Sequence, residues 1–229
     1  MLGWHVPVLM YHLVGNGPDE ASAIPGLVVS PALFAAQMTR LREAGWRTIT
    51  AAQLGADLAT GSHPPPKSFV VTLDDGHVDG YTEALPILEA NGFVATFFVV
   101  THRIGRLGWL SDADVLAMAE AGMEIADHTM DHVSLPRLPL LFALAEIDGA
   151  IAWIANALGH PPVTFAYPFG SQDPSVVSDV AHGGFSIAFT NREGCFESTA
   201  TRFLTPRLRV TPWMTPTALL DRLDACSYP

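Results

Sequence analysis

The chain has 229 residues, 49% of them hydrophobic and 15% charged, and its formal net charge is -11. This length is enough for one sizeable hydrophobic core and short for two independent domains, so we expect a single domain over residues 1–229. The composition excludes a disordered chain, and the small number of lysine and arginine residues, 12 in all, argues against a nucleic-acid partner.

Residues 1–6 carry neither a basic stretch nor a separate apolar stretch, both of which a secretory leader needs. We therefore expect no signal peptide, which indicates either a cytoplasmic protein or one whose leader was replaced or removed, and localisation stays open. No apolar run approaches the roughly 20 residues of a membrane helix, so we expect no transmembrane segment. Cys195 and Cys226 are too few and too far apart in sequence to define a disulfide framework, and we expect two free thiols.

Hydrophobic patterning predicts strands that alternate with helices along the first half of the chain. Ser30 followed by Pro31 predicts the start of an amphipathic helix that runs to about Ala44. Strands are expected at residues 6–11, 46–49, 69–73 and 94–100, and further helices at residues 51–58 and 81–90.

The alternation continues through the second half. Ser111 and Asp114 form a capping-box pattern that predicts a helix ending near Gly122. Strands are expected at residues 123–126, 163–167, 185–189 and 208–210, and helices at residues 140–158, at 174–180 and from Thr215-Pro216 onward. This order predicts a parallel sheet, and seven or so strand-helix units suggest a barrel. Active residues of such folds lie at the carboxyl ends of the strands.

Residues 68–76, S-F-V-V-T-L-D-D-G, are the stretch around which the predicted site is organised. A buried strand ends in Asp74 and Asp75, and Gly76 lets the chain turn away at once. Successive side chains on a strand point to opposite faces, so these two carboxylates can have different surroundings and different roles. Taken alone, Asp-Gly is also a common structural turn.

His128 and His132 follow the predicted strand at residues 123–126 and are four residues apart. We expect a helical turn that places both on one face, where their neutral imidazole nitrogens can bind one metal ion. Thr129 stands where the zincin proteases carry a glutamate, which excludes that protease pattern. An isolated histidine pair of this kind is more often an ordinary surface pair.

Three short motifs in a fixed order carry a family resemblance. T-L-D-D-G at residues 72–76, H-T-M-D-H at residues 128–132 and F-A-Y-P-F-G at residues 165–170 resemble the first three motifs of the polysaccharide deacetylases. These are the members of carbohydrate esterase family 4, which contain the NodB homology domain. V-L-M-Y-H at residues 8–12 and T-P-R-L-R-V at residues 205–210 resemble the poly-N-acetylglucosamine deacetylase branch. The resemblance implies an irregular, incomplete (β/α)7-type barrel.

The resemblance also implies a division of roles. Asp75, His128 and His132 are the expected metal ligands, and Asp74 is the expected general base. Zinc is the expected ion, with cobalt and nickel as alternatives, and it would polarise an acetyl carbonyl and activate a water molecule. The expected oxyanion and substrate contacts are the backbone N–H of Phe169, which replaces the usual tyrosine of the third motif, and the neighbouring Tyr167.

Two departures from the family pattern lead to two further predictions. Most members carry their catalytic acid in a Leu-x-His motif near the chain end, but no histidine follows His182 here. The branch resemblance points instead to His12, for which a core histidine is the alternative interpretation. Ala166 stands where many members have an arginine that pairs with the base. We therefore expect Arg207 to pair with Asp74 and to keep it ionised.

The predicted function is metal-dependent removal of N-acetyl groups from an amino-sugar polysaccharide or oligosaccharide. A xylan-type O-acetyl esterase is the close alternative, and a non-catalytic carbohydrate-binding barrel is the alternative from another class. The intact metal-ligand set speaks against the branch that resembles allantoinases. His77 is a further candidate substrate contact, and Trp109 and Trp213 could stack on sugar rings or belong to the core. Members of the family act mostly on exported or cell-wall glycans.

Overall fold

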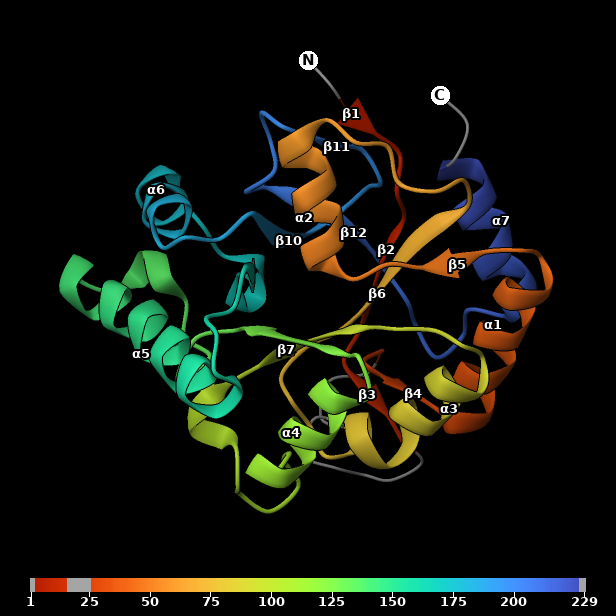
Figure 1. The fold of residues 1–229 in the computed structure, drawn as a ribbon, viewed down its shortest axis with the longest axis horizontal. Coiled ribbons are helices and arrows are strands. Elements are labelled where there is room, and N and C mark those ends of the chain that lie inside the picture. Colours follow the sequence, from red (N-terminus) through yellow and green to blue (C-terminus); the bar gives the residue numbers. More distant parts are fainter. Residues whose placement is uncertain (1–2, 16–25, 227–229) are drawn as a thin grey trace.

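Seven parallel strands form a closed ring in the computed structural model, which describes residues 3–15 and 26–226 (Figure 1). The ring strands are β2 (Val8–Tyr11), β6 (Ser68–Leu73), β7 (Thr96–Val99), β8 (Glu124–Asp127), β9 (Thr164–Ala166), β10 (Ile187–Glu193) and β12 (Thr205–Arg209). Their order is β2-β12-β10-β9-β8-β7-β6, and β2 pairs with β6 to close the ring. The predicted (β/α)7-type barrel is confirmed.

The ring is irregular in two places. A single residue pair, Asp127 and Phe165, joins β8 to β9, and the register shifts between β10 and β12. Short strands outside the ring complete the sheets: β1 (Gly3–Trp4) pairs with β11 (Glu197–Ser198), β3 (Leu13–Val14) with β4 (Val28–Val29), and β5 (Arg47–Thr48) with β6.

Helices surround the ring (Figure 1). They are α1 (Pro31–Glu43), α2 (Ala51–Thr60), α3 (Leu85–Ala90), α4 (Asp112–Glu120), α5 (Leu140–Leu158), α6 (Pro174–His182) and α7 (Pro216–Cys226). Ser30 and Thr50 cap α1 and α2 through their side-chain oxygens, and Ser111 with Asp114 forms the predicted capping box of α4. A π-helical segment, Gly80–Ala84, precedes α3 and occupies the first half of the helix predicted at residues 81–90.

The strands are buried on both faces because the barrel has an inner and an outer core. Val70 and Phe98 belong to the inner cluster, whereas their neighbours Val71 and Phe97 pack in the cluster beneath the outer helices. This alternation follows from the opposite directions of successive side chains on a strand. Because parallel strands all end at one rim, polar residues that follow them gather at the same mouth.

Cys195 and Cys226 form a disulfide bond, so the expectation of free thiols is wrong. Cys195 lies just after β10 and Cys226 ends α7, and the fold brings their Cα atoms to 5.9 Å although 31 residues separate them in sequence. Sequence spacing carries no information about this distance because α7 reaches the loop after β10 only through packing of the complete barrel.

Replacing both cysteines by serine should lower the free energy of unfolding by about 3–4 kcal/mol, because the bond closes a 31-residue separation in the unfolded chain. Urea unfolding of the oxidised protein and of the Cys195→Ser/Cys226→Ser variant measures this difference. Wild-type protein treated with reductant is the control and should unfold like the variant. Equal midpoints for the oxidised protein and the variant would contradict the prediction.

Helix α5 has 19 residues and is mostly apolar, although we expected no apolar stretch close to the length of a membrane span. Among the described residues, α5 is the one helix that is long and apolar enough to cross a membrane, by length and composition alone. It packs on β8, α4 and α6 and buries Ala143, Ile147 and Ala150 on one face. A core helix of a barrel meets the same criterion, so the absence of a transmembrane segment remains a prediction.

Candidate active site

A cavity of about 290 Å³ opens where the strands of the barrel end. Its wall contains His12, Leu27, Asp74, Asp75, His128, His132, Phe169, Asn191 and Arg209. Apart from Arg207 and Tyr167, every residue predicted as a catalytic residue, an oxyanion or substrate contact of the third motif, or a metal ligand is in this wall. The ring therefore brings together residues that lie far apart in sequence, as expected for the carboxyl ends of parallel strands.

Asp75, His128 and His132 converge on one point of the cavity wall. Asp75 Oδ1 lies 3.5 Å from His128 Nε2 and 3.2 Å from His132 Nε2. The same Oδ1 atom is buried and has no hydrogen-bond partner among the described residues, a costly arrangement unless a ligand compensates it. One carboxylate and two imidazoles within 4.8 Å of one another fit a divalent ion such as zinc.

The tautomer of His128 and the charge state of His132 suit metal binding. His128 Nδ1 lies 2.7 Å from the carbonyl oxygen of Ala166, so Nδ1 carries the proton and donates it, which leaves the Nε2 lone pair for a metal. Burial, reinforced by the neighbouring His128, lowers the pKa of His132 to about 4. His132 is therefore neutral at neutral pH, and neutral imidazole is the form that binds metal.

Residues 128–132 form a loop, not the expected helical turn. Thr129 and His132 have φ values of 67° and 57°, which lie in the left-handed region. The backbone N–H groups of Met130 and Asp131 donate to the carbonyl oxygen and the carboxylate of Glu146 on α5. The two histidines therefore meet because tertiary hydrogen bonds hold the loop. The four-residue spacing correctly indicated that they lie together, but a loop and not a helical turn brings them together.

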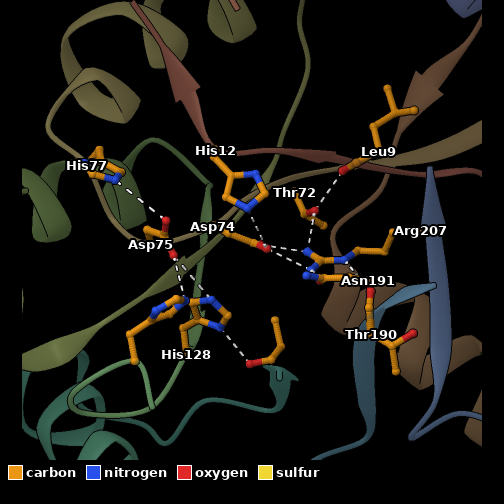
Figure 2. Close-up of polar contacts among 12 residues, drawn as sticks. Leu9, His12, Thr72, Asp74, Asp75, His77, His128, Thr190, Asn191 and Arg207 are labelled. Atoms are coloured by element: carbon orange, nitrogen blue, oxygen red, sulfur yellow. Dashed lines mark hydrogen bonds and ion pairs between the residues drawn. The ribbon is translucent and has the colours of Figure 1, made fainter. Parts of the chain in front are cut away.

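Arg207 makes the predicted contact with Asp74. Its Nη1 and Nη2 atoms lie 2.7 and 2.8 Å from the two carboxylate oxygens, and both side chains are buried (Figure 2). The remaining donors of the guanidinium bond to Thr190 O, Thr72 Oγ1 and Asn191 Oδ1. A bidentate pair of this kind fixes both the position and the orientation of the carboxylate.

The pair also sets the charge of Asp74. Burial by itself raises the pKa of this carboxyl group, and the Arg207 guanidinium, with smaller effects of His128 and His12, more than reverses the effect. The net result is a lowered pKa, so Asp74 is ionised at neutral pH and able to accept a proton.

His12 follows β2 and lines the cavity. Its ring lies beside the Asp74 carboxylate (Figure 2). Its Nε2 atom lies 4.0 Å from Asp74 Oδ2. Burial lowers the pKa of His12, while the carboxylates of Asp74 and Asp75 act in the opposite direction. The structure thus places a titratable imidazole within reach of the same space as the predicted base, and its catalytic role remains a prediction.

Tyr167 and Phe169 have opposite placements. The Tyr167 side chain is fully buried and its hydroxyl donates to the carbonyl oxygen of Phe203, and the role of Tyr167 at the site remains a prediction. Phe169 is 63% exposed, with its ring 4.5 Å from the His132 ring and a left-handed φ of 60°. The oxyanion role of the Phe169 backbone N–H remains a prediction.

The side chains of His77 and Trp109 pack against each other. Their rings stack with centroids 4.0 Å apart, and the Arg103 guanidinium lies 4.4 Å from the centroid of the Trp109 ring. His77 Nε2 is also 3.7 Å from Asp75 Oδ2. His77 therefore contacts Asp75, one of the predicted metal ligands, and is not among the residues that line the cavity. Trp213 is 72% exposed and keeps its candidacy for stacking on a sugar.

The backbone conformation of Gly170 and the close approach of Asn191 leave no room for a side chain at this position beside the site. Its φ is +65°, and a Cβ atom added there would lie 2.7 Å from the backbone nitrogen of Asn191. Gly170→Ala should therefore destabilise the fold by about 2–4 kcal/mol and lower kcat, because strain and overlap add and displace Asn191. Urea unfolding and steady-state kinetics measure both effects.

Gly92→Ala is the matched control for this prediction. Gly92 has nearly the same φ, +67°, but an added Cβ would meet nothing within 4 Å. This variant should show the backbone strain alone, about 1 kcal/mol, with unchanged kcat. If the two variants lose the same stability and the same activity, a side chain at position 170 does not displace Asn191, and the prediction is contradicted.

Asn191, Arg209 and Leu27 line the cavity but were not predicted from the sequence. A signal existed for Arg209, which stands two residues after Arg207 on one strand and therefore shares its face. Asn191 and Leu27 follow no recognisable pattern, and only the closed ring places them at the mouth.

Comparison with known proteins agrees with this geometry. Residues 61–188 match the family model described as polysaccharide deacetylase. The protein YxkH of Bacillus subtilis is 27% identical over 213 residues, which cover 93% of this chain and 74% of YxkH. The structure resembles the Streptococcus pyogenes deacetylase PplD, with a TM-score of 0.89 and 27% identity over 95% of this chain and 97% of that chain. It also resembles IcaB from Ammonifex degensii, with a TM-score of 0.82 and 26% identity over 98% and 97% of the two chains. Because the matched segment spans more than half of the 229 residues, this chain belongs to the polysaccharide deacetylase family.

Proposed function

We propose that this member of the family is a metal-dependent hydrolase that removes N-acetyl groups from an amino-sugar polysaccharide or oligosaccharide. One observation carries the proposal: adjacent carboxylates at the end of β6 serve two different clusters in one cavity. Asp75 joins two imidazoles, and Asp74 is clamped by a buried arginine. This separation of a metal-ligand group from an ionised base is what metal-assisted amide hydrolysis requires.

Asp75, His128 and His132 would hold the ion, which when bound supplies Lewis-acid polarisation of the acetyl group and a more acidic water molecule. Asp74 accepts the proton of the attacking water, and Arg207 keeps the Asp74 carboxylate ionised and oriented. The Phe169 N–H donates to the oxygen that gains negative charge.

His12 supplies the proton that the leaving nitrogen needs. This role requires the imidazolium form, which Asp74 and Asp75 favour and burial opposes. An amine is a poorer leaving group than an alcohol, so hydrolysis of an amide should depend on His12 more strongly than hydrolysis of an ester.

The test is release of acetate from N-acetylglucosamine oligomers by purified protein with added zinc. We expect acetate together with free amino groups on the oligomer, both lost in Asp74→Asn. Acetate from O-acetylated xylan alone would replace the proposal by the esterase function. Oligomer binding without any acetate release would replace it by the carbohydrate-binding function.

We propose that the chain acts in an oxidising compartment rather than in the cytoplasm. The bond between Cys195 and Cys226 supports this placement, because disulfides persist outside the cytosol and are rare within it. Alkylation of freshly prepared cell fractions, followed by mass spectrometry, should find both cysteines protected. Alkylated thiols in the native protein would favour the cytoplasm.

A further inference from the structure

The side chain of Arg209 places a cation in the wall of the cavity. Its side chain lies on the same face of β12 as that of Arg207, and it lines the cavity that Arg207 underlies. Its backbone N–H donates to Glu193 and its carbonyl accepts from Arg222. Within the part of the chain that the structure describes, its guanidinium has no hydrogen bond, ion pair or ring contact.

Asn191 adds further donors on the neighbouring strand. Its Oδ1 atom accepts a hydrogen bond from Arg207 Nη2 at 3.0 Å (Figure 2). A guanidinium has only donors, so this contact defines which end of the amide faces Arg207. The other end, the Nδ2 amino group, is free of partners among the described residues and belongs to a side chain that lines the cavity.

The charges of the cavity indicate which kind of ligand the donors of Arg209 and Asn191 would bind. Arg207 neutralises Asp74, and Asp75 belongs to the predicted metal ligands. The Arg209 guanidinium therefore has no carboxylate partner among residues 3–15 and 26–226. The hydrolysis steps above do not use its charge. Guanidinium and amide N–H groups placed side by side match the acceptors of a carboxylate.

We propose that Arg209 and Asn191 bind a carboxylate carried by the glycan, beside the acetyl group that is removed. This inference rests on the proposed function and narrows its substrate class to acidic amino-sugar glycans. Arg209 supplies the charge, and Asn191, positioned by Arg207 and Gly170, supplies direction. Binding of the carboxylate should act on KM more than on kcat, because the carboxylate takes no part in the chemical step.

A matched pair of substrates tests the proposal on the zinc-loaded protein. One substrate is peptide-free glycan strands of alternating N-acetylglucosamine and N-acetylmuramic acid. The other is the same strands with their carboxylates converted to neutral amides. We expect kcat/KM to be about tenfold or more higher for the acidic strands, the size of one charge-assisted hydrogen bond. Added salt should reduce the preference.

Variants assign the preference to the side chain. Arg209→Gln should abolish it by raising KM for the acidic strands, and Arg209→Lys should restore part of it. Arg42→Gln, which removes an exposed arginine on α1, is the control and should keep the full preference. Equal kcat/KM for the two substrates with the wild-type protein would overturn the proposal while leaving the deacetylase function intact.

Further outcomes distinguish this proposal from binding of the released acetate and from failure of the proposed function. If Arg209→Gln weakens only inhibition by acetate, the cation serves the released product and the proposal is overturned. Acetate release from N-acetylglucosamine oligomers but from neither strand would overturn the carboxylate proposal and leave the deacetylase function intact. If the oligomers and both strands release no acetate, the proposed function fails, and calorimetric binding of the two strands decides the carboxylate question directly. Tighter binding of the acidic strands that Arg209→Gln abolishes would then support the carboxylate site, and equal binding would overturn it.

Discussion

Asp74→Asn is expected to lower kcat by about 10²- to 10⁴-fold, the range attributed to a general base. Asparagine keeps the shape of the side chain but cannot accept the proton of the attacking water. The KM for N-acetylglucosamine oligomers should change little, because Asp74 binds the reacting water and not the sugar. Steady-state kinetics with bound zinc measured in both proteins gives the comparison, and the variant should retain the metal.

The loss of a buried charge needs a separate measurement. Arg207 is fully buried and would lose its counter-ion in Asp74→Asn, which can cost about 3–5 kcal/mol of stability. Urea unfolding of the variant therefore accompanies the kinetics, at a temperature where both proteins are folded. A folded, zinc-loaded variant with more than a tenth of wild-type kcat would contradict the assignment of Asp74 as the base.

Arg207→Met separates orientation and charge from the base itself. Burial raises the pKa of Asp74 and Arg207 lowers it, so removal of the guanidinium should raise it. The base works only when ionised, and activity is lost as pH falls through its pKa. The acid limb of the kcat/KM profile should therefore move to higher pH, with partial recovery in Arg207→Lys. An unchanged acid limb would remove Arg207 from the mechanism.

Asp75→Ala and His128→Ala are each expected to abolish both metal binding and acetate release. The purified wild-type protein should contain about one divalent ion per chain, and the loss of one of three protein ligands should remove it. Plasma mass spectrometry measures the ion, and the acetate assay is run on the same samples. His160→Ala, which removes an exposed histidine outside the cavity, is the control and should retain both properties.

Removal and return of metal complete this test. A chelator should abolish acetate release, and zinc should restore it, with cobalt and nickel as comparison ions. Bound metal without acetate release would keep the site and direct the search to esters. A folded protein that binds no divalent ion even after zinc or cobalt is added back would overturn metal dependence, and the carbohydrate-binding function would then lead.

Local patterns in the sequence were sufficient for the elements of the barrel. The capping box at Ser111 and Asp114, the proline after Ser30 and the apolar run before Asp74 are signals between residues close in sequence. The same local order placed Asp74 and Asp75 at the end of a strand. Adjacent residues with alternating directions need no distant contact to differ in role, and the structure shows them in different clusters.

The contact of Arg207 with Asp74 was predicted from the family pattern, since no local rule joins residues 133 positions apart. The histidine pair was recognised by its spacing, but its loop depends on Glu146, which lies on another helix. Tyr167 follows the end of β9 as predicted, but its burial could not be read from the sequence, because one residue of register decides whether a side chain at a strand end faces the cavity or the core.

The sequence by itself determined the alternation of strands and helices, the family motifs and the residue types of the site. Only the tertiary structure decided the closure of β2 on β6, the disulfide, the loop that holds His132, and the donors of Asn191 and Arg209 at the mouth. The reason is physical: propensity and periodicity act over a few residues. Ring closure and loop conformation depend instead on packing between segments that the linear order does not relate.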